Sequence, residues 1–291
     1  MFIQQLVNGL ALGMVYALIA VGFSLVFGIL RLVNFSHAAI FAFGAHVALF
    51  FIGLEVGPIP AILISMVLTG GVGILIDKVA LAPLRKKKSI PIAGLITTIG
   101  VSYILQNILT IVFGSGRVHF PAIIPPGGFD FLGTRITSMQ ILMFGVSLTL
   151  MLLLTYLVNH TKMGLAMRAM QQNPKAARLM GINVNSVIMF TFFLAGATAS
   201  IAGGLISGFY QMAYPAMGVS FGPKVFSATV LGGIGSMPGA FVGGILIGVI
   251  EVMAAMFLGS AYRDGAAFVV LILVLILRPQ GLFGRKLALK V

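Results

Sequence analysis

The sequence contains few charged residues, no cysteine and no tryptophan. Only 8% of its 291 residues are charged, 59% are hydrophobic, and the mean hydropathy is +1.14. A soluble domain carries about 25% charged residues because its surface must be hydrated. This chain cannot cover a water-facing surface of its own size, so we expect its outer surface to face lipid. The absence of cysteine also excludes disulfides and thiolate metal sites.

Motifs for nucleotide hydrolysis and zinc-dependent catalysis are missing as well. The dipeptide Gly-Lys never occurs, which excludes the phosphate-binding loop Gly-x-x-x-x-Gly-Lys-Ser/Thr. There is no His-Glu-x-x-His, and the four histidines lack the spacing of a metal site. We therefore expect that the chain is not an enzyme and that it needs no cofactor and no metal.

Long apolar runs are abundant instead. A helix crosses the hydrocarbon core of a bilayer with about 20 apolar residues. Runs of that kind lie at about 6–30, 34–53, 59–80, 90–113, 138–158, 187–209, 238–258 and 265–277, and a shorter run lies at about 223–236. The predicted fold class is an all-α, polytopic transmembrane helix bundle of about 8–9 spans, with a broken or short helix near 223–236. We expect a single transmembrane domain over residues 1–291.

The glycine-rich stretch at residues 231–240 has two interpretations. A regular helix facing lipid is excluded, because glycine, proline and serine crowd this stretch. It is either a broken helix of the kind that forms substrate sites in transporters, or a turn between two spans at the inner surface.

The positions of lysine and arginine predict the orientation. Fourteen of the eighteen basic residues lie in loops on one side of the predicted spans, including the cluster Arg85-Lys86-Lys87-Lys88. With that side inside, the N-terminus lies outside and the C-terminus in the cytoplasm, which requires an odd number of crossings. The net charge of +13 then reflects loops beside membrane lipid. Nucleic-acid binding is not expected, because it would need the charge on one folded face.

Small residues inside the spans predict close helix packing. Small-xxx-small spacings occur at Gly9/Gly13, Gly204/Gly208, Gly239/Gly243 and Gly244/Gly248. Because no hydrophobic force drives helices together in lipid, such residues favour association by letting backbones approach. These glycines indicate a compact bundle rather than a binding site.

Polar groups within the spans are few. Glu251 is the only acid deep within a span, and we expect it to pair with Lys224 or to cap a broken helix end. One isolated glutamate argues against a proton- or sodium-driven carrier. A mildly polar stripe suits contact with a pathway or with a partner span, and it consists of Gly94, Thr98, Ser102 and Gln106, with Thr97 and Asn107 alongside.

The basic loop at residues 159–186 predicts a short helix with its own start and stop signals. Asn173 can cap it, Pro174 suits the first helical position, and Gly181 suits a left-handed residue at its end. The preceding residues 165–170 also favour helix. Two helices that are small and Met-rich on one side and basic on the other could fit a groove on a soluble partner. Alternatively, they could lie flat on anionic headgroups.

Four stretches resemble a known family, the LivH-type permeases of branched-chain amino acid ABC importers, over nearly the whole chain. They are Tyr16–Leu25 continuing to Leu32–His37, then Ala82–Arg85, then Thr97–Ser102 with Gln106-Asn107, and finally Ala176–Ile182 paired with Val230–Ser236. Ser36 and Ala38 depart from the pattern, since relatives commonly have alanine and glycine there.

This resemblance implies the partners and the substrates of the chain. Two cytoplasmic ATP-binding subunits would supply the energy, a second permease subunit, identical or related, would share a central path, and an extracytoplasmic binding protein would deliver substrate across the bacterial inner membrane. The substrates would be leucine, isoleucine and valine, while close relatives carry other amino acids, urea or short amides. The main rival is an ion-coupled secondary carrier.

The resemblance also implies site residues. The helix at 173–181 would be the coupling helix that docks on an ATPase, which favours the partner interpretation of Asn173, Pro174, Ala177, Arg178 and Gly181. A mostly apolar path with a few hydroxyl groups suits aliphatic zwitterions. The candidates for lining that path are Asn34, Ser36, Thr97, Thr98 and Ser102.

Overall fold

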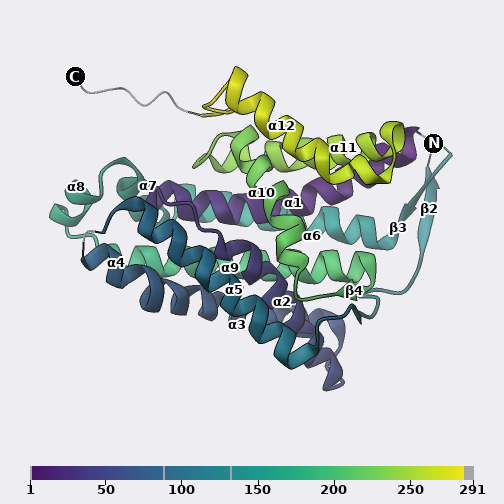
Figure 1. Cartoon of the computed structure of the whole chain (residues 1–291), viewed down its shortest axis with the longest axis horizontal. Coiled ribbons are helices and arrows are strands. Elements are labelled where there is room, and N and C mark those ends of the chain that lie inside the picture. The colour runs from purple at the N-terminus through teal and green to yellow at the C-terminus, as the bar shows by residue number, and fades with distance from the viewer. Residues whose placement is uncertain (1, 88, 132, 285–291) are drawn as a thin grey trace.

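The computed structural model describes residues 2–87, 89–131 and 133–284, which form a bundle of long helices (Figure 1). In chain order the elements are α1 (Phe2–Leu30), α2 (Ser36–Gly53), α3 (Pro58–Ile76), a π-helical turn (Asp77–Leu81), α4 (Ala82–Lys86), α5 (Pro91–Phe113), β1 (Val118–His119), β2 (Gly128–Phe131), β3 (Thr134–Thr137), α6 (Ser138–His160), α7 (Lys162–Gln172), α8 (Pro174–Leu179), α9 (Val184–Tyr210), β4 (Met212–Ala213), α10 (Met217–Gly232), α11 (Met237–Leu258), a 3-10 turn (Ser260–Tyr262) and α12 (Arg263–Leu277). Within this described part, eight helices are long and apolar enough to cross a membrane, which confirms the predicted all-α polytopic bundle.

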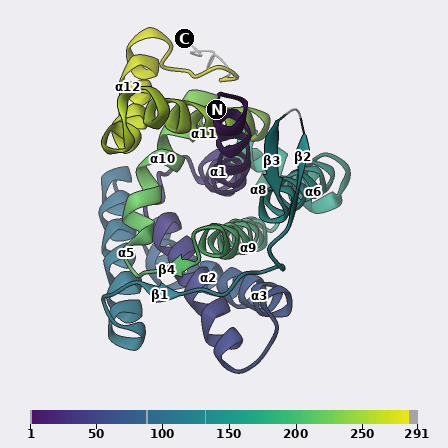
Figure 2. The ribbon, with the colours of Figure 1, turned by 90° about the vertical axis from the view of Figure 1, so that its right-hand side faces the viewer.

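The bundle has two distinct ends (Figure 1, Figure 2). At the strand end, β1 pairs with β4 and β2 pairs with β3, both antiparallel. At the loop end lie α7 and α8. The amide of Gln4 in α1 donates to the carbonyl of Arg135 (3.0 Å) at the strand end, whereas the backbone N–H of Leu282 donates to the carbonyl of Leu231 (2.8 Å) at the loop end. The two ends of the described part of the chain therefore lie at opposite ends of the bundle.

Helix α10 is not one of the eight candidate spans of the described chain, and it runs between the strand end and the loop end. Its 16 residues reach about 24 Å at 1.5 Å per residue, which is less than a hydrocarbon core of about 30 Å. The helix begins at Met217 rather than at the predicted 223. Pro223, at the start of the predicted run, lies inside the helix and removes one backbone donor there.

The glycine-rich stretch after α10 is a turn between two helices. Gly233 and Gly235 have φ of 107° and 86°, a region that glycine enters without steric cost. Ser236 then caps α11, since its hydroxyl accepts from the N–H of Gly239 (3.2 Å). Of the two interpretations of residues 231–240, the structure supports a turn between spans and not a broken helix at membrane depth.

Helix α1 forms the centre of the bundle and is buried along most of its length. It lies unusually close to α11, because a Cβ atom at Gly13 would lie 2.8 Å from the Cα of Ile245, and one at Gly248 would lie 2.3 Å from the Cα of Gly13. Only glycine permits such an approach of two backbones. The predicted packing through small residues is confirmed for this helix pair.

Candidate functional site

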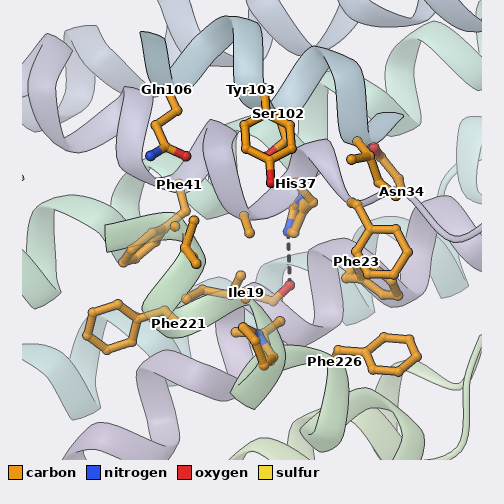
Figure 3. A pocket seen from close by; sticks show the side chains of 18 of the residues that line it. Ile19, Phe23, Asn34, His37, Phe41, Ser102, Tyr103, Gln106, Phe221 and Phe226 are labelled. Carbon is orange, nitrogen blue, oxygen red and sulfur yellow. Dashed lines mark hydrogen bonds between the residues drawn. The ribbon is translucent and has the colours of Figure 1, made fainter. Parts of the chain in front are cut away.

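A cavity of about 390 Å³ opens between α1, α2, α5, α10 and α12 (Figure 3). Its walls are mainly aromatic and aliphatic, and the residues used below are Ile19, Phe23, Phe41, Phe221, Phe226 and Phe268. A few polar side chains face the same space, namely Asn34, His37, Ser102, Tyr103 and Gln106. Ligand sites commonly combine an apolar lining of this kind with a small number of placed polar groups. The cavity is therefore the candidate substrate site.

The start of α2 supplies one polar corner of the cavity. The side-chain oxygen of Asn34 accepts from the N–H (3.1 Å) and from the hydroxyl (2.6 Å) of Ser36, which satisfies donors at the helix N-terminus. The N–H of Phe35 donates to the hydroxyl of Thr98 in α5 (3.2 Å). These bonds fix the start of α2 against α5, so that Asn34 is held at the cavity wall.

The five residues predicted to line the pathway thus fall into two groups. Asn34 and Ser102 line the cavity. Ser36 and Thr98 instead hold the start of α2, and the hydroxyl of Thr97 donates to the carbonyl of Ala93 within its own helix (2.8 Å). The structure does not place Ser36, Thr97 or Thr98 on the cavity surface.

His37 is a cavity residue that the sequence analysis missed. Its Nε2 lies 3.1 Å from the carbonyl oxygen of Ile19 (Figure 3), and because a carbonyl can only accept, Nε2 must carry the proton. The buried Nδ1 is then an acceptor, and it has no hydrogen-bond partner among the described residues. The only available signal was its place in the stretch Asn34-Phe35-Ser36-His37, which carries the family resemblance.

Helix α10 forms a second wall and packs tightly on α2. A Cβ atom at Gly218 would lie 2.4 Å from the carbonyl oxygen of Ala38, and one at Gly222 would lie 2.9 Å from the Cβ of Ala38. This close packing brings Phe221 and Phe226 to the cavity. The sequence analysis named neither aromatic residue, because phenylalanine is common throughout the chain.

Of the two roles considered for Glu251, the structure shows the pair with Lys224, and this pair is part of a larger cluster. Lys224 Nζ lies 2.9 Å from Glu251 Oε1 and 2.8 Å from Asp264 Oδ1. Arg263 Nε donates to the same oxygen of Glu251 (2.5 Å), and its terminal nitrogen donates to the hydroxyl of Tyr210 (2.9 Å). The cluster joins α9, α10, α11 and α12 beside the cavity.

The loop at residues 159–186 folds into α7 and α8 with the predicted caps. The side-chain oxygen of Asn173 accepts from the N–H groups of Lys175 (3.0 Å) and Ala176 (3.1 Å), and Pro174 occupies the first turn of α8. Gly181 has φ of 82°, the left-handed conformation expected after the helix. Ala177 is buried and Arg178 is exposed.

The Met-rich side of this loop packs against the bundle instead of facing outward. Met167 and Met170 are buried against the bundle, because α7 packs on α1, α6 and α9. The large apolar residues exposed on the two helices and just after them are Leu165, Leu179 and Met180. Together with Lys175 and Arg178, Leu179 and Met180 form the tip of the loop end, which extends beyond the long helices (Figure 1).

One motif of hydrolases occurs in the chain but in the wrong structural context. Residues 218–222 read Gly-Val-Ser-Phe-Gly, the spacing of a nucleophile elbow, which requires a sharp turn from a strand to a helix. Here the whole motif lies inside α10, and the hydroxyl of Ser220 accepts from the hydroxyl of Tyr214 (3.2 Å). The context that activates such a serine is therefore not present at Ser220.

The bundle and its cavity define a polytopic membrane protein of the transport class. The model of the family described as branched-chain amino acid transport system / permease component matches residues 5–277, and the chain belongs to this family. It is similar to the permease protein LivH of the high-affinity branched-chain amino acid transport system of Escherichia coli K12, at 37% identity over 98% of this chain and 96% of that protein. The corresponding permease BraD of Pseudomonas aeruginosa is 40% identical over the same shares, and a probable LivH of Methanocaldococcus jannaschii is 30% identical over 92% of this chain and 88% of that protein. The chain is accordingly the permease component of a transport system, and the family resemblance is confirmed.

Proposed function

We propose that this chain is the membrane-spanning subunit of an ABC importer that carries leucine, isoleucine and valine across the bacterial inner membrane. The observation that carries the proposal is the cavity, which offers aromatic and aliphatic walls to a branched side chain and a few polar groups to its charged ends. The similarity to permeases named for branched-chain amino acid transport supports the same substrates.

The energy comes from two separate cytoplasmic ATPase subunits. The chain has no phosphate-binding loop of its own, and the tip of its loop end combines the cations Lys175 and Arg178 with exposed Leu179 and Met180. An apolar patch flanked by charge suits docking on a soluble partner. With the loop end in the cytoplasm, the N-terminus lies outside and the C-terminus inside, in agreement with the distribution of basic residues.

The docked helix can act on the cavity through α7. The side-chain amide of Gln171 in α7 donates to the carbonyl of Gly235 (2.9 Å), in the turn that follows the cavity helix α10. A push on α8 is thereby passed to α7 and to the loop end of α10. A second, related permease subunit completes the path, and an extracytoplasmic binding protein delivers substrate at the strand end.

A change of cavity volume tests the proposed path. Ser102→Phe places an aromatic ring in the cavity of about 390 Å³, and we expect uptake of labelled leucine by the assembled transporter to fall at least about tenfold, since the ring occupies space that the substrate needs. The matched control is Asn107→Phe, because Asn107 is exposed on another face of the same helix.

The same assay tests the substrate class. Unlabelled isoleucine and valine should compete with leucine, whereas urea and short amides should not. Competition by urea alone, or equal uptake by the Ser102→Phe and Asn107→Phe variants, would contradict the proposal.

A further inference from the structure

The cluster of Lys224, Glu251, Arg263 and Asp264 contains buried charges that the proposed path does not use. The Glu251 side chain is fully buried and that of Lys224 is 8% exposed, whereas that of Asp264 is 67% exposed. Charges in the interior of a membrane bundle are costly, and they are usually found at functional positions. Lys224 is the only member of the cluster that belongs to α10.

Lys224 lies directly behind the cavity wall. Its neighbours Pro223 and Val225 both line the cavity, and its Nζ lies 5.3 Å above the ring of Phe221, which also lines it. Because Pro223 lacks an N–H, α10 loses a backbone hydrogen bond at this point and bends there more easily than a regular helix. Any movement of α10 at Pro223 changes the position of Lys224 and the width of the cavity together.

The ion pairs of Lys224 oppose such a movement. One pair ties α10 to Glu251 in α11 (2.9 Å), and the other ties it to Asp264 in the first turn of α12 (2.8 Å). Because α12 supplies Phe268 and Leu271 to the cavity, the second pair joins two of its walls. With both pairs formed, the walls contributed by α10 and α12 are held together.

The surroundings of Glu251 allow its ion pair with Lys224 to break. Arg263 binds the same carboxylate oxygen, so the carboxylate keeps a cation when Lys224 moves away. The other oxygen, Oε2, and the nearby hydroxyl of Tyr16 are both buried without a hydrogen-bond partner in the described structure. A small shift would let this hydroxyl donate to Oε2. The carboxylate therefore has replacement partners on α1 and α12.

We propose that Lys224 is a positioning residue for transport, an ionic latch that holds α10 to α11 and α12 and keeps the cavity narrow until α10 moves. The latch rests on the proposed function, because it acts on the same cavity. Its release at Pro223 separates the walls and admits the substrate, and its re-formation closes them.

The absence of cysteine allows a direct test with a single reporter. Ser102→Cys places one thiol in the cavity, and its rate of reaction with N-ethylmaleimide is measured in the assembled transporter, with and without ATP. In this background we expect Lys224→Met to raise the nucleotide-free rate at least about tenfold and to remove its dependence on ATP, because a buried ion pair is lost. Lys224→Arg keeps the charge and should stay near the parent rate.

A milder variant keeps the test decisive if Lys224→Met fails to fold. Asp264 is largely exposed, so Asp264→Asn should fold while weakening the tie to α12, and we expect a rise in reaction rate of about two- to fivefold. The matched control is Asp130→Asn, another exposed aspartate at the strand end, which should leave the rate unchanged. Parent rates in Asp264→Asn, or a Lys224→Met variant that is recovered poorly but reacts at the parent rate, would overturn the latch. Failure of leucine uptake by the parent transporter would instead overturn the proposed function.

Discussion

At the scale of single residues, the ion pair between Asp77 and Arg85 joins the end of α3 to α4. Asp77 is buried in the π-helical turn after α3, and the two guanidinium nitrogens of Arg85 donate to its two oxygens at 2.5 and 3.0 Å. The fork geometry of arginine suits a carboxylate, and lysine could not replace it. The pair fixes α4, and with it the start of the loop that leads to α5.

Removing Arg85 tests this role. Arg85→Met leaves the Asp77 carboxylate buried without its partner, and we expect a loss of about 2 kcal/mol in the free energy of unfolding, less than the about 3–5 kcal/mol of a fully buried pair because Arg85 is partly exposed. Thermal unfolding in detergent measures the change. Lys86→Met is the control, since Lys86 is exposed and forms no ion pair in the described structure. Recovery of stability by a second change, Asp77→Asn, would confirm that the unpaired carboxylate is the cause.

Residue-level predictions from sequence succeeded where partners lie close in the chain or carry charge. The cap at Asn173 was predicted correctly, since caps follow local rules. The pair between Glu251 and Lys224 was one of two alternatives for Glu251, because a buried acid requires a cation but a helix end can also satisfy it. The cavity lining was predicted only in part. Whether Thr98 faces the cavity or bonds to Phe35 depends on how α5 rotates against α2, and no local pattern determines that rotation.

At the scale of helices, the close contact between α1 and α11 leaves no room for larger side chains at its glycines. Gly13→Val would place side-chain atoms within 3 Å of the Ile245 backbone, so we expect the variant to be recovered from membranes in much smaller amounts than the parent. Gly145→Val is the control, because a Cβ atom at Gly145 in α6 would meet no atom within 4 Å. Equal recovery of the two variants, measured by fluorescence size exclusion of detergent extracts, would show that α1 and α11 are not closely packed.

Helix α8 tests the coupling role at the same scale. Arg178→Glu reverses an exposed charge at the tip of the loop end, and we expect ATP-driven leucine uptake to fall about tenfold while thermal stability stays unchanged. Lys86→Glu reverses a charge in α4 outside this tip and should have little effect. Normal uptake by Arg178→Glu would exclude the tip as the ATPase contact.

Element boundaries were predictable for long apolar helices and less so for short elements. The eight long spans follow from hydropathy. The start of α10 was predicted at 223 instead of Met217, because Pro223 lies inside the helix. The pairing of β1 with β4 joins residues about 94 positions apart in sequence, and two-residue strands carry no alternating pattern that could predict them.

At the scale of the whole molecule, the chain is a permease that places an apolar cavity between α1, α2, α5, α10 and α12 and the exposed tip of its loop end at one end of the bundle. α10 connects these two features, since it lines the cavity and ends in the turn that Gln171 contacts. The central claim of the account is that the chain forms the path but takes its energy from another protein. An ion-coupled carrier would need neither the tip nor a partner.

Reconstitution in liposomes tests that claim most directly. The measurement is accumulation of labelled leucine by vesicles that contain the chain alone, or the chain with its partner permease, two ATPase subunits, internal ATP and external binding protein. We predict accumulation only in the complete system, abolished by vanadate and unaffected by a protonophore. Accumulation by the chain alone, or loss of accumulation with the protonophore but not with vanadate, would contradict the account.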